Sequence, residues 1–324
     1  MKSKLLMAGL ASTSFFALAT ALTPAANALT VRDDVTVAGS EEYADDPQWD
    51  GVVQIYHMFP GGSINFNCSG TLINARTVIT AAHCFNDYPS DYYSDYNELI
   101  TPIIAYGPDT FDALFGWLGQ SELTETYEFD ERSGLVFANQ VIIHPDADPA
   151  FGANLDFPAA DVALVSLSSP LANLPSYSML FSPAPVGSHV SMVAYGGHGT
   201  GSTGDVGIDG KRQAGENILG MVGSQVDFLS AVFGTDASPY YTTQPGASQS
   251  QYWIDFDNPD RTGEECGRND IGDWACSDGA FWWYFDNPVT NTWFNNSLSN
   301  DILPGHALDY EAGTAGGDSG SPLF

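Results

Sequence analysis

The stretch Gly316-Gly317-Asp318-Ser319-Gly320-Ser321-Pro322 lies at the end of the 324-residue chain. Glycines on both sides of Ser319 permit a tight turn that exposes the serine hydroxyl. Such a turn directs the N–H groups of Gly317 and Ser319 into one hollow, which makes them a candidate oxyanion hole. Clusters of Gly, Ser and Asp also form ordinary turns, so the stretch alone leaves both interpretations open.

Two other stretches supply the groups that an activated serine needs. A serine hydroxyl is a weak nucleophile at neutral pH and requires a base, which a third group holds in the correct tautomer. His83 ends the apolar, strand-like run Val78-Ile79-Thr80-Ala81-Ala82 and is the candidate base. Asp161 precedes the apolar run Val162-Ala163-Leu164-Val165 and is the candidate orienting group. Burial of an unpaired carboxylate costs several kcal/mol, so we expect Asp161 to have a partner.

These motifs resemble those of the chymotrypsin/trypsin-like serine peptidases, through Thr80-Ala81-Ala82-His83-Cys84, Asp161-Val162-Ala163-Leu164 and Gly317-Asp318-Ser319-Gly320. Their order, His then Asp then Ser, distinguishes this family from other triad enzymes. The resemblance implies an all-β fold of two six-stranded barrels with the triad in the cleft between them. It implies His83 as general base and acid, Asp161 as orienting group, Ser319 as nucleophile, and the Gly317 and Ser319 amides as the oxyanion hole. The implied activity is peptide-bond hydrolysis through an acyl-enzyme. We expect no cofactor and no metal, and an acidic turn at Asp255, Asp257, Asn258 and Asp260 is favoured over the alternative of a calcium loop, because the glycine and terminal glutamate of an EF-hand are missing.

Two features near the nucleophile depart from the family pattern. The resemblance places Gly313 at the floor of the specificity pocket, which disfavours Lys or Arg as the preferred residue, although Glu311 is close in sequence. Family members continue through further strands beyond the nucleophile, whereas here the chain stops five residues after Ser319. We therefore expect the C-terminal part of the domain to be missing, the second barrel to be incomplete and the chain to be poorly active alone.

Short β-branched runs separated by turns predict an all-β fold over residues 49–324. The patterns predict strands over 51–58, 136–144 and 190–195, and a hairpin of residues 67–73 and 77–80. Residues 29–48 are acidic and lack apolar periodicity, which predicts a loose acidic leader. The stretches 85–130 and 211–304 are longer than the resembled family needs and are expected to be loop insertions.

Residues 1–28 have the layout of a secretory signal. Lys2 and Lys4 precede an uncharged run over 5–22, and Ala26-Asn27-Ala28 resembles a cleavage site. The alternative, a membrane anchor, is weaker because Ser, Thr and Gly dilute the run. We expect a mature chain that begins near Leu29 and is secreted, periplasmic or on the cell surface, with no membrane span.

In the resembled family a new N-terminus often inserts beside the residue equivalent to Asp318, and Val31 and Val37 are two candidates for that role.

Four cysteines form two local pairs, which fits two disulfides in an oxidising compartment: Cys68 with Cys84, and Cys266 with Cys276. The first pair brackets the segment leading to His83, where the resembled family also has a bridge. A zinc site is disfavoured because neither pair has Cys-x-x-Cys spacing.

The chain has 9 basic and 40 acidic residues, for a formal net charge of −31. Such a charge excludes nucleic-acid binding through a basic patch. The hydrophobic content of 44% suffices for a globular core.

We expect a monomer that acts on a protein or peptide substrate. The alternatives are a protease-like binding protein without activity, or an inactive fragment of a protease. An α/β-hydrolase esterase is disfavoured because position 321 is not glycine and no histidine follows Ser319.

Overall fold

The computed structural model describes residues 29–60, 62–85, 100–124, 134–145, 147, 160–201, 203–224, 227, 251–254, 267–268, 274–275, 307–314 and 317–324. Within these ranges the α-helices are α1 (Val37–Ala44) and α2 (Thr110–Thr124), and the 3-10 helices are η1 (Pro47–Trp49) and η2 (Ala82–Phe85). The strands are β1 (Leu29–Val31), β2 (Val52–Met58), β3 (Ile64–Asn74), β4 (Thr77–Thr80), β5 (Thr101–Ala105), β6 (Leu135–Ile143), β7 (Ala163–Leu167), β8 (His189–Ala194), β9 (His198–Thr200), β10 (Gly204–Asp205), β11 (Gln213–Ile218), β12 (Met221–Gly223), β13 (Gln251–Trp253), β14 (Gly267–Arg268), β15 (Trp274–Ala275) and β16 (Ala312–Gly313).

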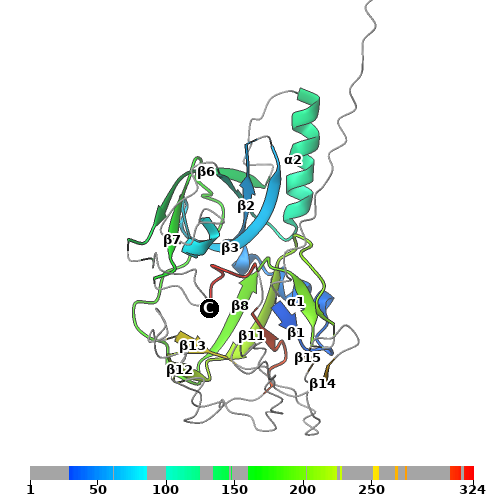
Figure 1. Ribbon diagram of the computed structural model, residues 1–324, viewed down its shortest axis with the longest axis vertical. Coiled ribbons are helices and arrows are strands. Elements are labelled where there is room, and N and C mark those ends of the chain that lie inside the picture. Colours follow the sequence, from blue (N-terminus) through cyan, green and yellow to red (C-terminus); the bar gives the residue numbers. More distant parts are fainter. Residues whose placement is uncertain are drawn as a thin grey trace, which may run out of the picture.

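Six strands close an antiparallel barrel in the first half of the chain (Figure 1). Their order around the barrel is β2-β3-β4-β7-β6-β5. The hairpin predicted from the sequence is confirmed as β3 and β4, in which Thr71 pairs with Ile79 and Leu72 with Val78. This closed barrel and the scarcity of helix confirm the all-β class.

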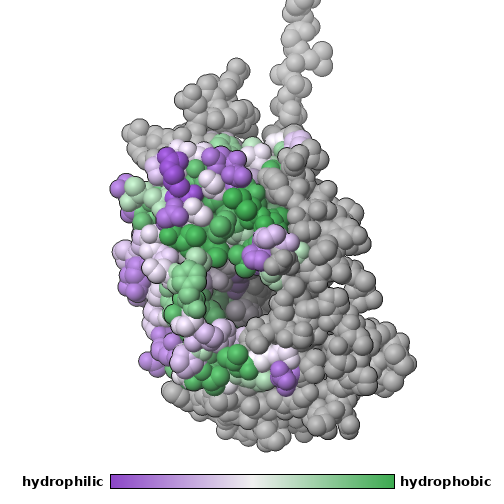
Figure 2. Space-filling model, turned by 90° about the vertical axis from the view of Figure 1, so that its left-hand side faces the viewer, coloured by the Kyte–Doolittle hydropathy of each residue, from purple (hydrophilic) through white to green (hydrophobic). Residues whose placement is uncertain are grey.

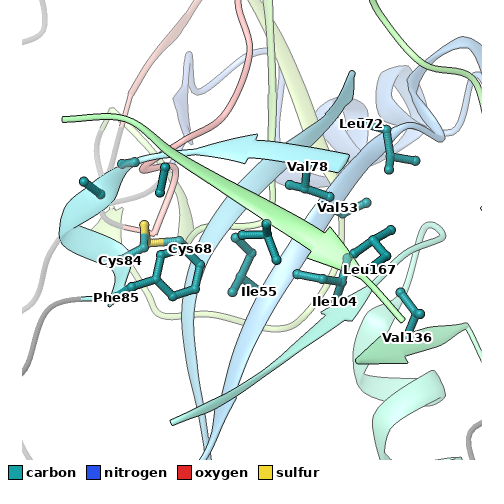
Figure 3. Packing of buried hydrophobic residues seen from close by; sticks show 14 of the residues in the cluster. Val53, Ile55, Cys68, Leu72, Val78, Cys84, Phe85, Ile104, Val136 and Leu167 are labelled. Carbon is teal, nitrogen blue, oxygen red and sulfur yellow. A yellow bond between two sulfur atoms is a disulfide. The ribbon is translucent and has the colours of Figure 1, made fainter. Parts of the chain in front are cut away.

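Apolar side chains fill the barrel and hold its strands together (Figure 3). Val53 and Ile55 from β2 lie in this core with Leu72 from β3 and Leu167 from β7, and all four are fully buried. Burial of each such side chain contributes about 1.5–3 kcal/mol relative to exposure. Figure 3 shows the disulfide at one end of this core, next to Phe85.

Strand β2 is buried along almost its whole length because it borders three clusters. Val53 and Ile55 face the barrel interior, whereas Tyr56 packs in a cluster with Leu114 and Trp117 of α2. Val52 packs with Val193 and Tyr195, which belong to the second half of the chain, beyond the barrel strands. β2 is therefore buried on both faces, because its side chains alternate between the barrel interior and the clusters outside the barrel.

The second half of the described chain forms smaller sheets below the barrel in Figure 1. β8 and β11 pair along six residues in antiparallel register, from Gln213 opposite Ala194 to Ile218 opposite His189. A separate sheet has the order β10-β9-β1-β16. The described residues do not close a second barrel.

The prediction of a loose acidic leader over 29–48 was wrong, because this segment is folded into the second half of the molecule. β1 lies between β9, to which it is parallel, and β16, to which it is antiparallel. Leu29 and Val31 are buried with Met192, Ala194 and Ala312. The helix α1 follows, and the Ser40 hydroxyl donates a 2.7 Å hydrogen bond to the carbonyl of Ala214 in β11. A three-residue strand has no local periodicity, which is why the sequence did not indicate it.

The stretch 85–130, expected to be a loop insertion, contains two regular elements, so that expectation was wrong for residues 101–105 and 110–124. β5 pairs with β2 and β6 and closes the barrel. In α2, Leu114 and Trp117 are buried against the barrel. β5 and α2 were not predicted from the sequence because the tyrosines and aspartates between 86 and 99 dominate the composition of the stretch.

Of the two predicted disulfides, Cys68–Cys84 is present, with an S–S distance of 2.02 Å. Cys266 and Cys276 lie outside the described residues, as does most of the 211–304 stretch beyond residue 227. Neither helix in the described part of the chain has the length and apolar character required to cross a bilayer.

Candidate active site

His83 lies on η2, directly after β4. The Cys68–Cys84 disulfide ties the residue after His83 to β3. The His83 side chain is 32% exposed. The imidazole is therefore anchored through its neighbour, while part of it reaches the surface.

Strand register brings Asp161 to His83. β4 and β7 are antiparallel with Thr80 opposite Ala163, so the residues that follow β4 lie beside those that precede β7. Oδ2 of Asp161 lies 2.6 Å from Nδ1 of His83, and Oδ1 accepts a 2.8 Å hydrogen bond from the His83 backbone N–H. An ionised carboxylate only accepts hydrogen bonds, so Nδ1 of His83 carries a proton, and in the neutral imidazole Nε2 is then the nitrogen with the free lone pair.

The turn that carries Ser319 packs against β3 and the end of β4. The Ser319 carbonyl accepts a 3.0 Å hydrogen bond from the Ser69 N–H. Gly320 has φ 82°, and a Cβ there would overlap Oγ1 of Thr80 and lie 2.6 Å from the Ser69 carbonyl oxygen. Only glycine tolerates both the left-handed backbone and this close approach.

The same turn reaches the segment that carries His83. The Ser319 carbonyl oxygen lies 3.9 Å from Sγ of Cys84. That sulfur is part of the disulfide and has no proton to donate, so this is a packing contact. The main chain of Ser319 thus lies at the end of the first barrel where His83 and Asp161 are paired.

The residues just before Ser319 are held by the segment that follows β8. Asp318 is buried, and its Oδ1 accepts a 3.2 Å hydrogen bond from the Gly196 N–H. Gly317 has φ 88°, and a Cβ there would lie 2.6 Å from the ring of Phe66. Val31 and Val37, the residues considered as new termini beside Asp318, lie in β1 and at the first residue of α1.

Figure 2 shows the face on the left-hand side of Figure 1, with a hollow between the upper and lower halves and apolar residues gathered above and below it. In Figure 1 the C-terminal segment, coloured red, runs between the same two halves. The C-terminal segment, which carries Ser319, therefore lies between the two halves.

One cluster in the described residues has the composition of a metal site but not its chemistry. The sulfurs of Cys68 and Cys84 and a ring nitrogen of His83 lie within 4.8 Å of one another. The sulfurs are bonded to each other and offer no thiolate, which is the form that binds metals. The cluster is the packing of the disulfide against the imidazole.

The predicted pocket residue Gly313 lies in β16, opposite Thr30 of β1. Nearby Glu311 is buried, and its carboxylate accepts hydrogen bonds from Nδ2 of Asn217 at 3.1 Å and from the Leu308 N–H at 2.9 Å. The Glu311 carboxylate is thus engaged inside the protein.

The structure adds one residue that the sequence did not indicate. Ser69, on β3, places its hydroxyl 3.0 Å from both the Tyr195 N–H and the Gly317 carbonyl. A serine next to a half-cystine carries no local signal for such a role, because both partners are more than 120 residues away in sequence.

Comparison with known proteins relates the chain to one family. A search of the curated proteins found no match. A solved structure titled "Structure of GrC" is similar, with 15% identity over 60% of this chain and 69% of its own, and a TM-score of 0.36. The model of the Trypsin family matches residues 36–213, a range that includes His83 and Asp161 and ends before Ser319. Because this match spans more than half of the 324 residues, the chain belongs to the Trypsin family of serine peptidases.

Proposed function

We propose that this chain is a secreted serine endopeptidase whose catalytic residues are His83, Asp161 and Ser319. The observation that carries the proposal is the double contact of Asp161 with His83, one oxygen on Nδ1 and the other on the backbone N–H. This contact fixes the ring orientation and leaves Nε2 as the basic nitrogen. Family membership supplies the reaction class.

The proposed reaction is acyl transfer in two halves. Nε2 of His83 takes the Ser319 hydroxyl proton as Oγ attacks the peptide carbonyl carbon, and a tetrahedral oxyanion forms. The C–N bond then breaks, and the His83 proton passes to the leaving amine. Water attacks the resulting ester with His83 again as base, and the ester bond breaks to release the acid and restore the Ser319 hydroxyl.

The Gly317 and Ser319 N–H groups are the proposed oxyanion donors. Removal of one such donor costs about 3 kcal/mol of transition-state stabilisation in comparable sites. The positions of these two amides therefore matter nearly as much as those of the three side chains.

A fluorophosphonate probe tests the nucleophile directly, because it phosphonylates an activated serine and is detected by intact mass. The full chain should gain one adduct that peptide mapping places on Ser319. Ser319→Ala should lose the adduct and any peptide hydrolysis while it keeps its circular dichroism spectrum. Ser321→Ala, two residues further along the same segment, is the matched control and should label normally.

Absence of labelling in the folded wild-type chain would favour the alternative of a binding protein without activity. Labelling that persists in Ser319→Ala would place the nucleophile elsewhere. Both results contradict the proposed function.

For specificity we propose a substrate residue that is not Lys or Arg on the acyl side of the cleaved bond. Gly313 supplies no charge, and the Glu311 carboxylate already binds Asn217 and Leu308. A panel of chromogenic peptides should show preference for uncharged residues. Gly313→Asp should raise kcat/KM for Lys and Arg substrates relative to Phe and Leu substrates, and an unchanged ratio would exclude Gly313 from the pocket floor.

Export with cleavage near Leu29 is also part of the proposal. Its support is that residues from Leu29 onward belong to the fold, since the Leu29 side chain is buried in the second half. N-terminal sequencing of the secreted protein should give a start at or near Leu29. A start after Val31 would remove β1 and contradict this part of the proposal.

A further inference from the structure

We propose that Ser69 is a positioning residue for the oxyanion hole, a role that rests on the proposed peptidase function. Ser69 lies on β3, directly after Cys68, and is fully buried. Its hydroxyl contacts the Tyr195 N–H and the Gly317 carbonyl oxygen, each at 3.0 Å. These two groups come from two neighbouring segments, the one that follows β8 and the turn that carries Ser319.

The chemistry of the three groups fixes the direction of both hydrogen bonds. A backbone N–H only donates and a carbonyl oxygen only accepts, whereas a hydroxyl does both. The Tyr195 N–H therefore donates to a lone pair of Oγ, and the Ser69 proton is directed to Gly317. A side chain without a hydroxyl leaves both buried backbone groups without this partner, which is costly.

The hydrogen bond from the Ser69 hydroxyl restrains Gly317, a residue of the turn with a left-handed backbone. Gly317 has φ 88° and, as a glycine, gains no restriction from a side chain. The Ser69 hydroxyl holds the Gly317 carbonyl, while the Ser69 N–H holds the Ser319 carbonyl at 3.0 Å. Between them, Asp318 is held by the Gly196 N–H. Ser69 thus donates hydrogen bonds to the turn on both sides of Asp318. The carbonyls that accept them belong to Gly317 and Ser319, whose amides would bind the oxyanion.

The contact also joins the two halves of the molecule. Ser69 belongs to the first barrel, and Tyr195 follows β8 of the second half. The Ser69 carbonyl accepts a 2.7 Å hydrogen bond from Oγ1 of Thr80, the last residue of β4 before the His83 segment. One side chain and its own backbone therefore connect the turn of Ser319, the segment after β8 and the strand that leads to His83.

Ser69→Ala tests the role because it keeps the backbone bonds and removes the hydroxyl alone. Loss of the hydroxyl's hydrogen bond to the Gly317 carbonyl should lower kcat by about tenfold, with KM unchanged within about twofold. The affinity for a peptide boronic acid, which forms a tetrahedral adduct on the serine, should fall by a similar factor. Ser69→Gly should behave in the same way, and Ser69→Thr, which retains a hydroxyl, should recover part of the loss.

Thr71→Val is the matched control on the same strand. Thr71 is buried two residues further along β3, and its Oγ1 has no hydrogen-bond partner among the described residues. This variant removes a buried hydroxyl without affecting the turn, so kcat and boronate affinity should stay at the wild-type values.

The outcomes separate this inference from the proposed function. A wild-type chain that is not labelled by fluorophosphonate overturns both. A labelled wild type in which Ser69→Ala and Ser69→Gly keep wild-type kcat and boronate affinity overturns the role of Ser69 alone. A loss of thermal stability without a change in kcat likewise assigns Ser69 a structural role only. Should Ser69→Ala fail to fold, the comparison is made with Ser69→Gly.

Discussion

Glycine at position 320 shows how a single residue sets the geometry of the candidate site. Its φ of 82° lies in the left-handed region, and its Cα faces Thr80 and Ser69 without room for a side chain. Two separate costs therefore oppose any other residue: backbone strain and steric overlap. The first costs about 1–2 kcal/mol and the second about 1–3 kcal/mol.

Gly320→Ala should thus lower the free energy of unfolding by more than about 2 kcal/mol and reduce fluorophosphonate labelling of Ser319. Gly62→Ala separates the two costs, because Gly62 has φ 85° and no group of the described residues lies within 4 Å of the position that its Cβ would take. Urea unfolding of both variants should show the smaller loss for Gly62→Ala. Equal losses would mean that the turn relaxes away from Thr80 without penalty.

His57 is a second single residue with a measurable consequence. Burial lowers its pKa from the usual 6.5 to about 4. Between these values the unfolded chain binds a proton that the folded protein does not, so the free energy of unfolding falls as the pH drops from 6.5 to 4. The full effect is about 3 kcal/mol, and it is absent above pH 6.5.

Urea midpoints at pH 7 and pH 4.5 test this, because His57→Phe should flatten the pH dependence and fit the aromatic surroundings of Phe59 and Phe85. A His57→Phe variant with the same slope as the wild type would contradict the assignment.

At the scale of elements, β1 is a central strand of its sheet although only three residues long. It pairs with β9 on one side and with β16 on the other, and β16 contains the proposed pocket residue Gly313. Val31 is fully buried in the cluster with Met192 and Ala312. The stability of the sheet that contains Gly313 therefore depends on residues directly after the proposed signal.

Val31→Ala should lower the free energy of unfolding by about 2 kcal/mol, because it removes two buried methyl groups and leaves a cavity. Val206→Ala, at a position 60% exposed, is the control and should change stability little. Differential scanning calorimetry of the two variants gives the comparison. An equally small effect at Val31 would show that β1 contributes nothing to the fold.

At the scale of the whole molecule, the candidate site is divided between the two halves, so its geometry depends on their junction. Buried Arg212 lies at this junction and donates to the Ala44 carbonyl at 3.0 Å and to Asp50, ahead of β2, at 2.9 Å. The Tyr195 hydroxyl adds a 2.6 Å hydrogen bond to the Gly107 carbonyl. Polar groups from both halves thus form a defined junction between them.

Asp50→Asn should destabilise the protein more than Arg212→Met does. The first leaves a buried guanidinium without its counter-ion, at a cost of about 2 kcal/mol after allowance for the partial exposure of Asp50. The second removes the buried charge together with its desolvation cost. Urea unfolding of both single variants and the double variant measures the order, and a larger loss for Arg212→Met would contradict this account.

Local signals in the sequence sufficed for several strands of the first barrel and for the family. The strand pattern over 51–58, the hairpin through Val78 and the pairing of Cys68 with Cys84 are determined by residues close together in the chain. The order of His83, Asp161 and Ser319 indicated the family for the same reason, since each motif is short and continuous. These features could be predicted because periodicity and turn chemistry act over a few residues.

The tertiary structure alone decided the roles of β1, β5, Ser69 and Arg212. A three-residue strand becomes a strand only when β9 and β16 supply its hydrogen bonds, and β5 is recognised by the barrel that it closes. Ser69 and Arg212 acquire their roles from backbone groups more than 120 residues distant. The physical reason is that sheet pairing and the satisfaction of buried polar groups depend on which distant segments meet, and no short stretch of sequence contains that information.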